Sequence, residues 1–143
     1  MKKIISILFI VAFTVSATFA QSGRAIQFPV IAGDTITNTG SANKIITASG
    51  GYNSIGIQPV ITKVSGTVGG NAILYASQDG TNYVALGDTL KCTDQTTNTK
   101  LFKYTDIPYT YYKIVYTGTG TMVAKWEVWY TERKSMVIVS TPQ

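Results

Sequence analysis

Residues 109–132 read YTYYKIVYTGTGTMVAKWEVWYTE and contain the clearest strand pattern of the chain. In its second half every other residue is apolar: Met122, Ala124, Trp126, Val128 and Tyr130. Such period-two alternation is typical of a β-strand with one face on a core and the other in water. The first half alternates in the same way, with Tyr112, Ile114 and Tyr116 on one face. The glycine-bearing segment 118–120 separates the halves and predicts that they pair as an antiparallel hairpin.

Further strands are indicated upstream of this stretch. Residues 71–78 and 82–86 flank Asp79-Gly80, a dipeptide that suits the positive-φ positions of a tight hairpin turn. Residues 55–64 predict a strand with an edge or a bulge at Pro59, because proline cannot donate to a ladder. Weaker strands are expected at 25–31, 35–38, 44–48 and 100–105, with a loop at 89–99 and a last strand or a free arm at 136–139.

About eight or nine short strands, with no helical segment between them, indicate an all-β fold. We expect an antiparallel two-sheet β-sandwich, jelly-roll-like or immunoglobulin-like, over residues 21–143. Apolar residues make up 45% of the 143, which is enough to build the core of one domain.

Residues 1–20 follow the plan of a secretory signal peptide, which forms a short N-terminal helix. Lys2 and Lys3 precede an uncharged apolar run over 4–15, and small residues lead to Ala20. The Lys-Lys start and the Ala-Gln junction resemble signal peptides of Bacteroidetes-type bacteria. The segment predicts a secreted, periplasmic or cell-surface protein that has no membrane contact after cleavage. An uncleaved N-terminal anchor is the alternative, although the apolar run is shorter than the roughly 20 residues of a membrane span.

The composition argues against catalysis. The chain has no His and a single Cys, Cys92, which excludes His-based triads, His metal sites and a disulfide framework. Seven acidic residues leave a small hydrolase with paired carboxylates as a weaker alternative. No metal or cofactor is expected, and the residues around Asp79 are better explained by a turn than by a calcium site. Basic residues are scattered singly, unlike those of nucleic-acid binders, so no nucleic-acid partner is expected.

Aromatic side chains crowd the last third of the chain. Tyr111 and Trp129 fall on the faces of their strands away from the core, and a hairpin would bring them within cross-strand reach. Together with the nearby Tyr109, they are the predicted contacts to a ligand or a partner. An exposed Tyr and Trp can stack on a sugar ring or anchor a protein. The alternative is that a second layer of structure covers this face.

Three segments carry a resemblance to a known family: KVSGTV at 63–68, LYASQDGTNYV at 74–84 and DIPYTYYKIVYTGTGT at 106–121. Over residues 60–129 the chain resembles the small β-sandwich structural proteins of tailed bacteriophages. That resemblance implies a fibre, decoration or tail-associated part of a virion without catalytic activity. The SQDGTNY hairpin is also similar to one in discoidin-like carbohydrate-binding sandwiches. The leader departs from the phage pattern, because virion parts assemble in the cytoplasm.

These patterns together predict a non-enzymatic, exported structural or adhesion module, with the virion as the alternative location. Thr-rich strands with few charges leave sheet edges open to another chain. We therefore expect protein subunits as partners, joined through an edge strand and an assembly tail of Met136, Val137, Ile138 and Val139. A carbohydrate-binding module that uses Tyr111 and Trp129 to hold a glycan is the alternative.

Overall fold

The computed structural model describes residues 25–27, 34–106 and 109–133, and every regular element in these ranges is a β-strand. The all-β prediction is therefore confirmed for this part of the chain. The predicted leader at 1–20 and the assembly tail at 136–139 lie outside the described residues. None of the described residues belongs to a helix that is long and apolar enough to span a membrane.

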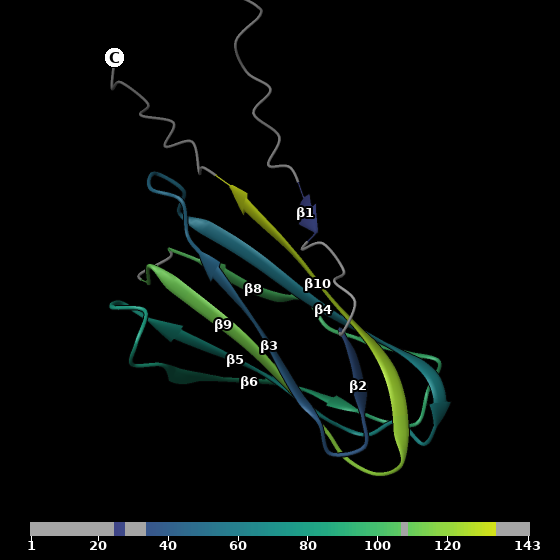
Figure 1. Ribbon diagram of the computed structural model, residues 1–143. Coiled ribbons are helices and arrows are strands. Elements are labelled where there is room, and N and C mark those ends of the chain that lie inside the picture. Colours follow the sequence, from purple (N-terminus) through teal and green to yellow (C-terminus); the bar gives the residue numbers. More distant parts are fainter. Residues whose placement is uncertain (1–24, 28–33, 107–108, 134–143) are drawn as a thin grey trace, which may run out of the picture.

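The strands form two antiparallel sheets that pack face to face (Figure 1). Sheet A has at its centre β10 (Met122–Arg133) paired with β4 (Ser54–Gly66). Short strands flank this pair: β1 (Ala25–Gln27) and β2 (Thr35–Thr37) on β10, β7 (Thr97–Thr99) and β8 (Phe102–Thr105) on β4. Sheet B has the order β3 (Ser41–Thr47), β9 (Tyr111–Gly118), β5 (Gly70–Ser77) and β6 (Val84–Cys92).

The strand pairs are nested along the chain. β5 pairs with β6 at the centre of the sequence, β4 with β7 and β8 around them, then β3 with β9, and both β1 and β2 with β10 outermost. Successive pairs alternate between the sheets, so the chain resembles one long antiparallel ribbon folded over itself. This is the connectivity of a jelly roll, which selects that alternative over the immunoglobulin order.

The predicted hairpin of residues 109–132 is wrong, although both of its strands exist. β9 lies in sheet B and β10 lies in sheet A, so the segment between them crosses from one sheet to the other. Their apolar faces meet in the core, where the rings of Tyr116 and Trp126 stack with centroids 5.6 Å apart. The alternation identified the core face of each strand correctly, because all the predicted core residues are buried except the half-buried Tyr130.

The second predicted hairpin is confirmed, with a longer connection than expected. β5 and β6 pair directly, but the connection runs over 78–83, and only Gly80 in it has a positive φ, of 72°. The Asp79 carboxylate accepts hydrogen bonds at 2.8 Å from the backbone N–H groups of Thr81 and Asn82 and so holds the turn. The predicted loop at 89–99 is wrong at both ends, since β6 continues to Cys92 and β7 begins at Thr97.

Pro59 lies within β4, and on one side this strand has no described partner there, so the predicted edge is confirmed locally, whereas the predicted bulge is not found at this position. The register shift of β4 against β10 lies further along, between Val123 and Ala124. On its other side Pro59 faces the gap between β7 and β8, and Thr99 Oγ1 donates to its carbonyl oxygen at 2.9 Å. Because the N and O of one strand residue point to the same side, the missing N–H is directed at this gap. The proline therefore removes no bond from the ladder.

Candidate functional site

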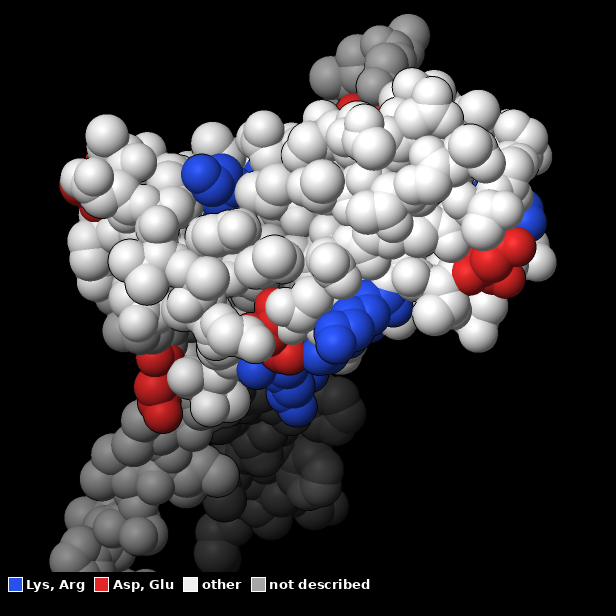
Figure 2. All heavy atoms as spheres, turned by 90° about the horizontal axis from the view of Figure 1, so that it is seen from below, with Lys and Arg blue, Asp and Glu red and all other residues white. Residues whose placement is uncertain are grey.

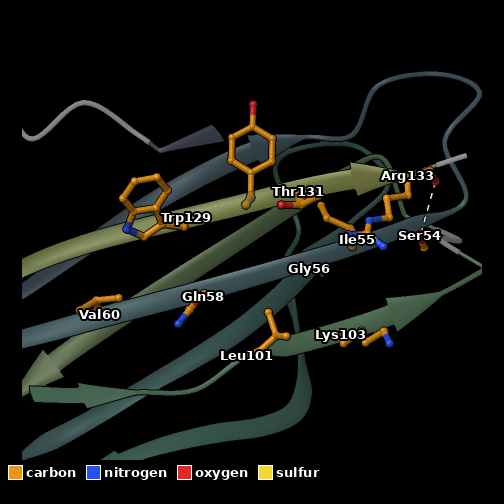
Figure 3. Close-up of a pocket in the computed structure, with 11 residues that line it drawn as sticks. Ser54, Ile55, Gly56, Gln58, Val60, Leu101, Lys103, Trp129, Thr131 and Arg133 are labelled. Atoms are coloured by element: carbon orange, nitrogen blue, oxygen red, sulfur yellow. Dashed lines mark hydrogen bonds between the residues drawn. The ribbon is translucent and has the colours of Figure 1, made fainter. Parts of the chain in front are cut away.

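A groove of about 420 Å³ lies on the outer face of sheet A (Figure 3). Its floor is Gly56 of β4, where an added Cβ would lie 3.5 Å from Leu101 Cδ1. Trp129 of β10 stands on one side, next to Gln58 in register, and Leu101 of the β7–β8 connection stands on the other. Its volume is that of a small-molecule site. We call this feature the sheet A groove; it is also lined by Ser54, Ile55, Val60, Lys103, Tyr130, Thr131 and Arg133.

The sheet A groove combines apolar walls with positive charge. Trp129 is 37% exposed and Leu101 is 58% exposed, so both offer apolar surface to a bound molecule. Lys103 pairs in register with Gly56, and Arg133 pairs with Ser54 at the end of the groove. None of the described lining residues is acidic, and neither cation forms a salt bridge with a described residue. The groove therefore favours an anionic group over a cation.

The structure does not bring the predicted contact residues together. Trp129 lies in the sheet A groove, whereas Tyr111 lies on the outer face of sheet B, where its ring is next to Gly80. The two side chains cannot form one platform, because they occupy opposite faces of the sandwich. Tyr109 is half-buried and packs edge-on against Tyr112, with ring centroids 6.1 Å apart. Whether any of the three contacts a ligand stays a prediction.

Sheet B carries an aromatic cluster that already holds a cation of its own chain. The Lys113 ammonium lies 3.9 Å from the centroid of the Tyr83 ring and 5.6 Å from that of Tyr75. Such contacts are favourable because the ring face is electron-rich. Lys113 thus has partners within its own chain, whereas Lys103 and Arg133 of the sheet A groove form no salt bridge with a described residue.

Strand β3 forms an open edge of sheet B. Gly118 N–H donates to Gly40 O at 2.9 Å, and Ala48 N–H donates to Thr110 O at 2.8 Å, so the even-numbered residues of β3 face β9. The odd-numbered residues then direct their backbone N–H and C=O groups away from the sheet; these are Ser41, Asn43, Ile45 and Thr47. No other described strand pairs with this side.

The other edges among the described strands are less open than β3. The edge strands of sheet A have only three or four residues each, and β6 is irregular opposite the stretch between Ile73 and Tyr75. Short strands and bulges protect an edge, as does an exposed lysine. The one lysine of β3, Lys44, donates to both carboxylate oxygens of Asp34 at 3.0 and 3.1 Å and is largely buried. β3 therefore lacks all three protections.

The titratable groups show no catalytic arrangement among the described residues. Burial raises the pKa of the Cys92 thiol to about 11, so this buried side chain is a poor nucleophile. Hydrogen bonds from Asn82 and Thr81 hold the pKa of Asp79 well below its ordinary value, as expected for a carboxylate that organises a turn. The described residues contain no cluster of three or more acidic or Cys side chains that could hold a metal ion.

Several residues of the two surfaces escaped the sequence reasoning. Leu101 and Lys103 lie in the segment 100–105, which was expected to be only a weak strand, and Arg133 follows the last residue of the predicted strand at 121–132. Gly56 carried a usable signal, because a glycine inside a strand marks a close approach or a vacant position on the sheet face. Its even spacing from Gln58 and Val60 also placed these three on the outer face.

The described residues thus combine a jelly-roll β-sandwich with an edge strand, β3, that has no described partner on one side, and a groove that carries two cations. No family model matches the sequence, and no curated protein matches it. Among solved structures, a chain of the T13 viral particle of infectious bursal disease virus (IBDV) is similar, with a TM-score of 0.42, 14% identity, 76% of this chain covered and 31% of that chain. A chain of the Gx strain of this virus has a TM-score of 0.35 and 15% identity, with 86% of this chain and 36% of that chain covered. A chain of the Gt strain has a TM-score of 0.34 and 22% identity, with 78% of this chain and 31% of that chain covered.

This chain thus spans about a third of the length of the viral chains it matches. At these TM-scores and identities, the likeness carries no information about function. The resemblance to tailed-phage proteins and the exported location stay predictions from the sequence.

Proposed function

We propose that this protein is a non-enzymatic structural module, exported by its predicted leader, that joins protein subunits through the open edge of strand β3. The site of assembly is a cell surface or, as the alternative, a virion. Absence of His from the sequence supports a role without catalysis.

The observation that carries the proposal is the state of β3. Its outward-facing N–H and C=O groups form a seven-residue template for another strand. Lys44, which would otherwise repel a second copy of this strand, is paired with Asp34. Ile45, on the outer face of the same strand, is 49% exposed and offers apolar contact to an incoming chain. Figure 2 shows one face of the molecule, on which charged side chains stand in a few separate places among mostly uncharged residues.

A second copy of β3 fits this edge in an antiparallel arrangement. With a two-fold axis at Lys44, Asn43 of each copy lies opposite Ile45 of the other copy, and Ser41 lies opposite Thr47 of the other copy. All four residues direct backbone donors and acceptors outward, so each opposed pair exchanges two hydrogen bonds. The same edge also suits a strand of a different subunit, including the segment 136–139 of another copy.

The oligomeric state tests this proposal. By size-exclusion chromatography with light scattering, we expect the protein to form a dimer as its concentration is raised. Asn43→Pro removes an N–H that faces the open side, so it blocks the edge without breaking the β3–β9 ladder. Ile45→Lys adds a charge to the same edge. Both variants should be monomeric and folded.

Val64→Lys provides the matched control, because Val64 is 64% exposed and lies on β4 in the other sheet. This variant should associate like the wild type. A protein that stays monomeric at every concentration, with or without residues 134–143, contradicts the proposal. So does an oligomer that survives both β3 substitutions.

A further inference from the structure

We propose that the sheet A groove is a binding site for an acidic sugar, that is, a pyranose ring bearing a carboxylate or a sulfate. The groove lies on the outer face of sheet A and the open edge belongs to sheet B, so this inference does not depend on assembly through β3. It differs from the Tyr111 and Trp129 platform predicted from the sequence, because Tyr111 has no part in it.

Trp129 supplies the stacking surface. Its side chain is 37% exposed, on a strand held on one side by β4 and on the other by β1 and β2. A tryptophan fixed in this way loses little conformational freedom on binding. The C–H face of a sugar ring packs on an indole, while the ring hydroxyls remain at the periphery. Leu101, 58% exposed across the Gly56 floor, provides the opposing apolar contact.

Polar groups for the ring hydroxyls lie beside the indole. Gln58, next to Trp129 in register, donates its Nε2 to Thr99 Oγ1 at 3.1 Å. The same amide carries an Oε1 that can accept a hydrogen bond from a hydroxyl. Thr131, two residues beyond Trp129 and opposite Gly56, presents a hydroxyl that both donates and accepts.

The cations account for the acidic group. Lys103 lies in register with Gly56, two residues from the Trp129 level, and Arg133 lies four residues beyond Trp129 on the same strand. At ~3.3 Å per residue, Arg133 begins about 13 Å from Trp129. This span is longer than one pyranose ring, so the groove suits an acidic unit within an oligosaccharide. Guanidinium and ammonium groups both bind carboxylate and sulfate oxygens.

The other exposed aromatic surface fits such a ligand less well. On sheet B, Lys113 already lies over Tyr83 and Tyr75, and Tyr111 covers Gly80. A sugar would have to displace the lysine before it could stack there. A protein segment is the competing occupant of the sheet A groove, and it becomes an outcome of the test.

A glycan array provides the first test. The full protein is applied to printed neutral, uronate-containing, sialylated and sulfated glycans. We expect signal confined to the acidic classes. No signal on any glycan, or signal on neutral glycans of equal strength, would overturn the proposal.

Calorimetry with the strongest acidic glycan then assigns the site. Trp129→Ala should weaken binding about tenfold or more, and Gly56→Val should do the same by filling the floor. Lys103→Ala with Arg133→Ala should remove the preference for the acid over its methyl ester or desulfated form. Lys91→Ala, an exposed cation on sheet B, is the matched control and should bind normally.

The contrary results are specific. Unchanged affinity in Trp129→Ala places the glycan elsewhere and overturns the assignment. A change of oligomeric state in Trp129→Ala, without any glycan binding by the wild type, identifies the groove as a subunit contact instead. Circular dichroism and thermal melting of each variant separate loss of binding from loss of folding.

Discussion

The stack of Tyr116 on Trp126 offers a sharp test of the jelly-roll connectivity. Both side chains are fully buried, and their rings lie 5.6 Å apart with 18° between the planes. Complete truncation of a buried Trp costs about 3–5 kcal/mol, so Trp126→Leu should lower the free energy of unfolding by about 2–3 kcal/mol. Tyr116→Leu should lower it similarly, since it also removes the 2.8 Å hydrogen bond from the Tyr116 hydroxyl to Gly69 O. A stacked aromatic pair is worth about 0.5–1.5 kcal/mol beyond its area, so the double variant should show a coupling energy in that range.

Urea unfolding followed by tryptophan fluorescence and circular dichroism measures the four free energies of this cycle. The matched control is a second cycle between Tyr116 and Trp129, which lies on the outer face of β10. Its coupling energy should be below about 0.5 kcal/mol, as for residues without shared partners. If the two cycles give equal coupling, β9 and β10 do not face each other across the core, and the connectivity described above is refuted.

Three further predictions concern single positions. Gly66 has a φ of +70°, and an added Cβ would overlap Thr121 O, so Gly66→Ala should lower the free energy of unfolding in urea by more than about 2 kcal/mol. Gly56→Ala should leave that free energy unchanged or raise it by about 0.5 kcal/mol. Equal effects of the two substitutions would contradict this prediction. The pKa of Asp79 is lower in the folded state than in the unfolded state, so its contribution to stability is full above the unfolded pKa and is lost as the pH falls below that value. The difference in free energy of unfolding between the wild type and Asp79→Asn should therefore shrink from pH 6 towards pH 3. A difference that stays constant over this range would contradict the prediction. Burial raises the pKa of Cys92 to about 11, so a thiol reagent at pH 8 should label it in urea but not in the native protein, and rapid native labelling would disprove its burial.

The local pattern of the sequence predicted much of this fold. The alternation over 122–128 and at Tyr112, Ile114 and Tyr116 identified the core faces, because a half-buried strand imposes a period of two on its side chains. The turn at Asp79-Gly80 identified the innermost hairpin, β5–β6. Among the described strands, these are the only two that follow each other in the chain and also pair with each other.

Long-range pairing was the part that the sequence did not reveal. The segment 118–120 has the glycines of a hairpin turn, yet it links β9 to β10 across two sheets. A glycine-bearing connection permits either geometry, and in this fold β10 pairs with β4 whereas β9 pairs with β5. Short-range residue patterns contain no information about that choice of partner.

The candidate sites were predictable to different degrees. Trp129 was identified because its parity on the strand placed it opposite the core. Its partners in the sheet A groove come from β4 and the β7–β8 connection, and they meet Trp129 only through the register of sheet A. The edge position of β3 was likewise invisible, since nothing in residues 41–47 indicates which strands end up on either side.

Assembly through the β3 edge can be followed by hydrogen exchange at single amides of this strand. In dilute protein the amides of Asn43 and Ile45, which face the open side, should exchange rapidly, whereas the amide of Lys44 is bonded to β9 and should exchange slowly. At concentrations where the protein associates, we expect the Asn43 and Ile45 amides to slow by about tenfold or more, with Lys44 unchanged. If Asn43 and Ile45 still exchange rapidly in the associated protein, subunits join through another surface and the account is contradicted.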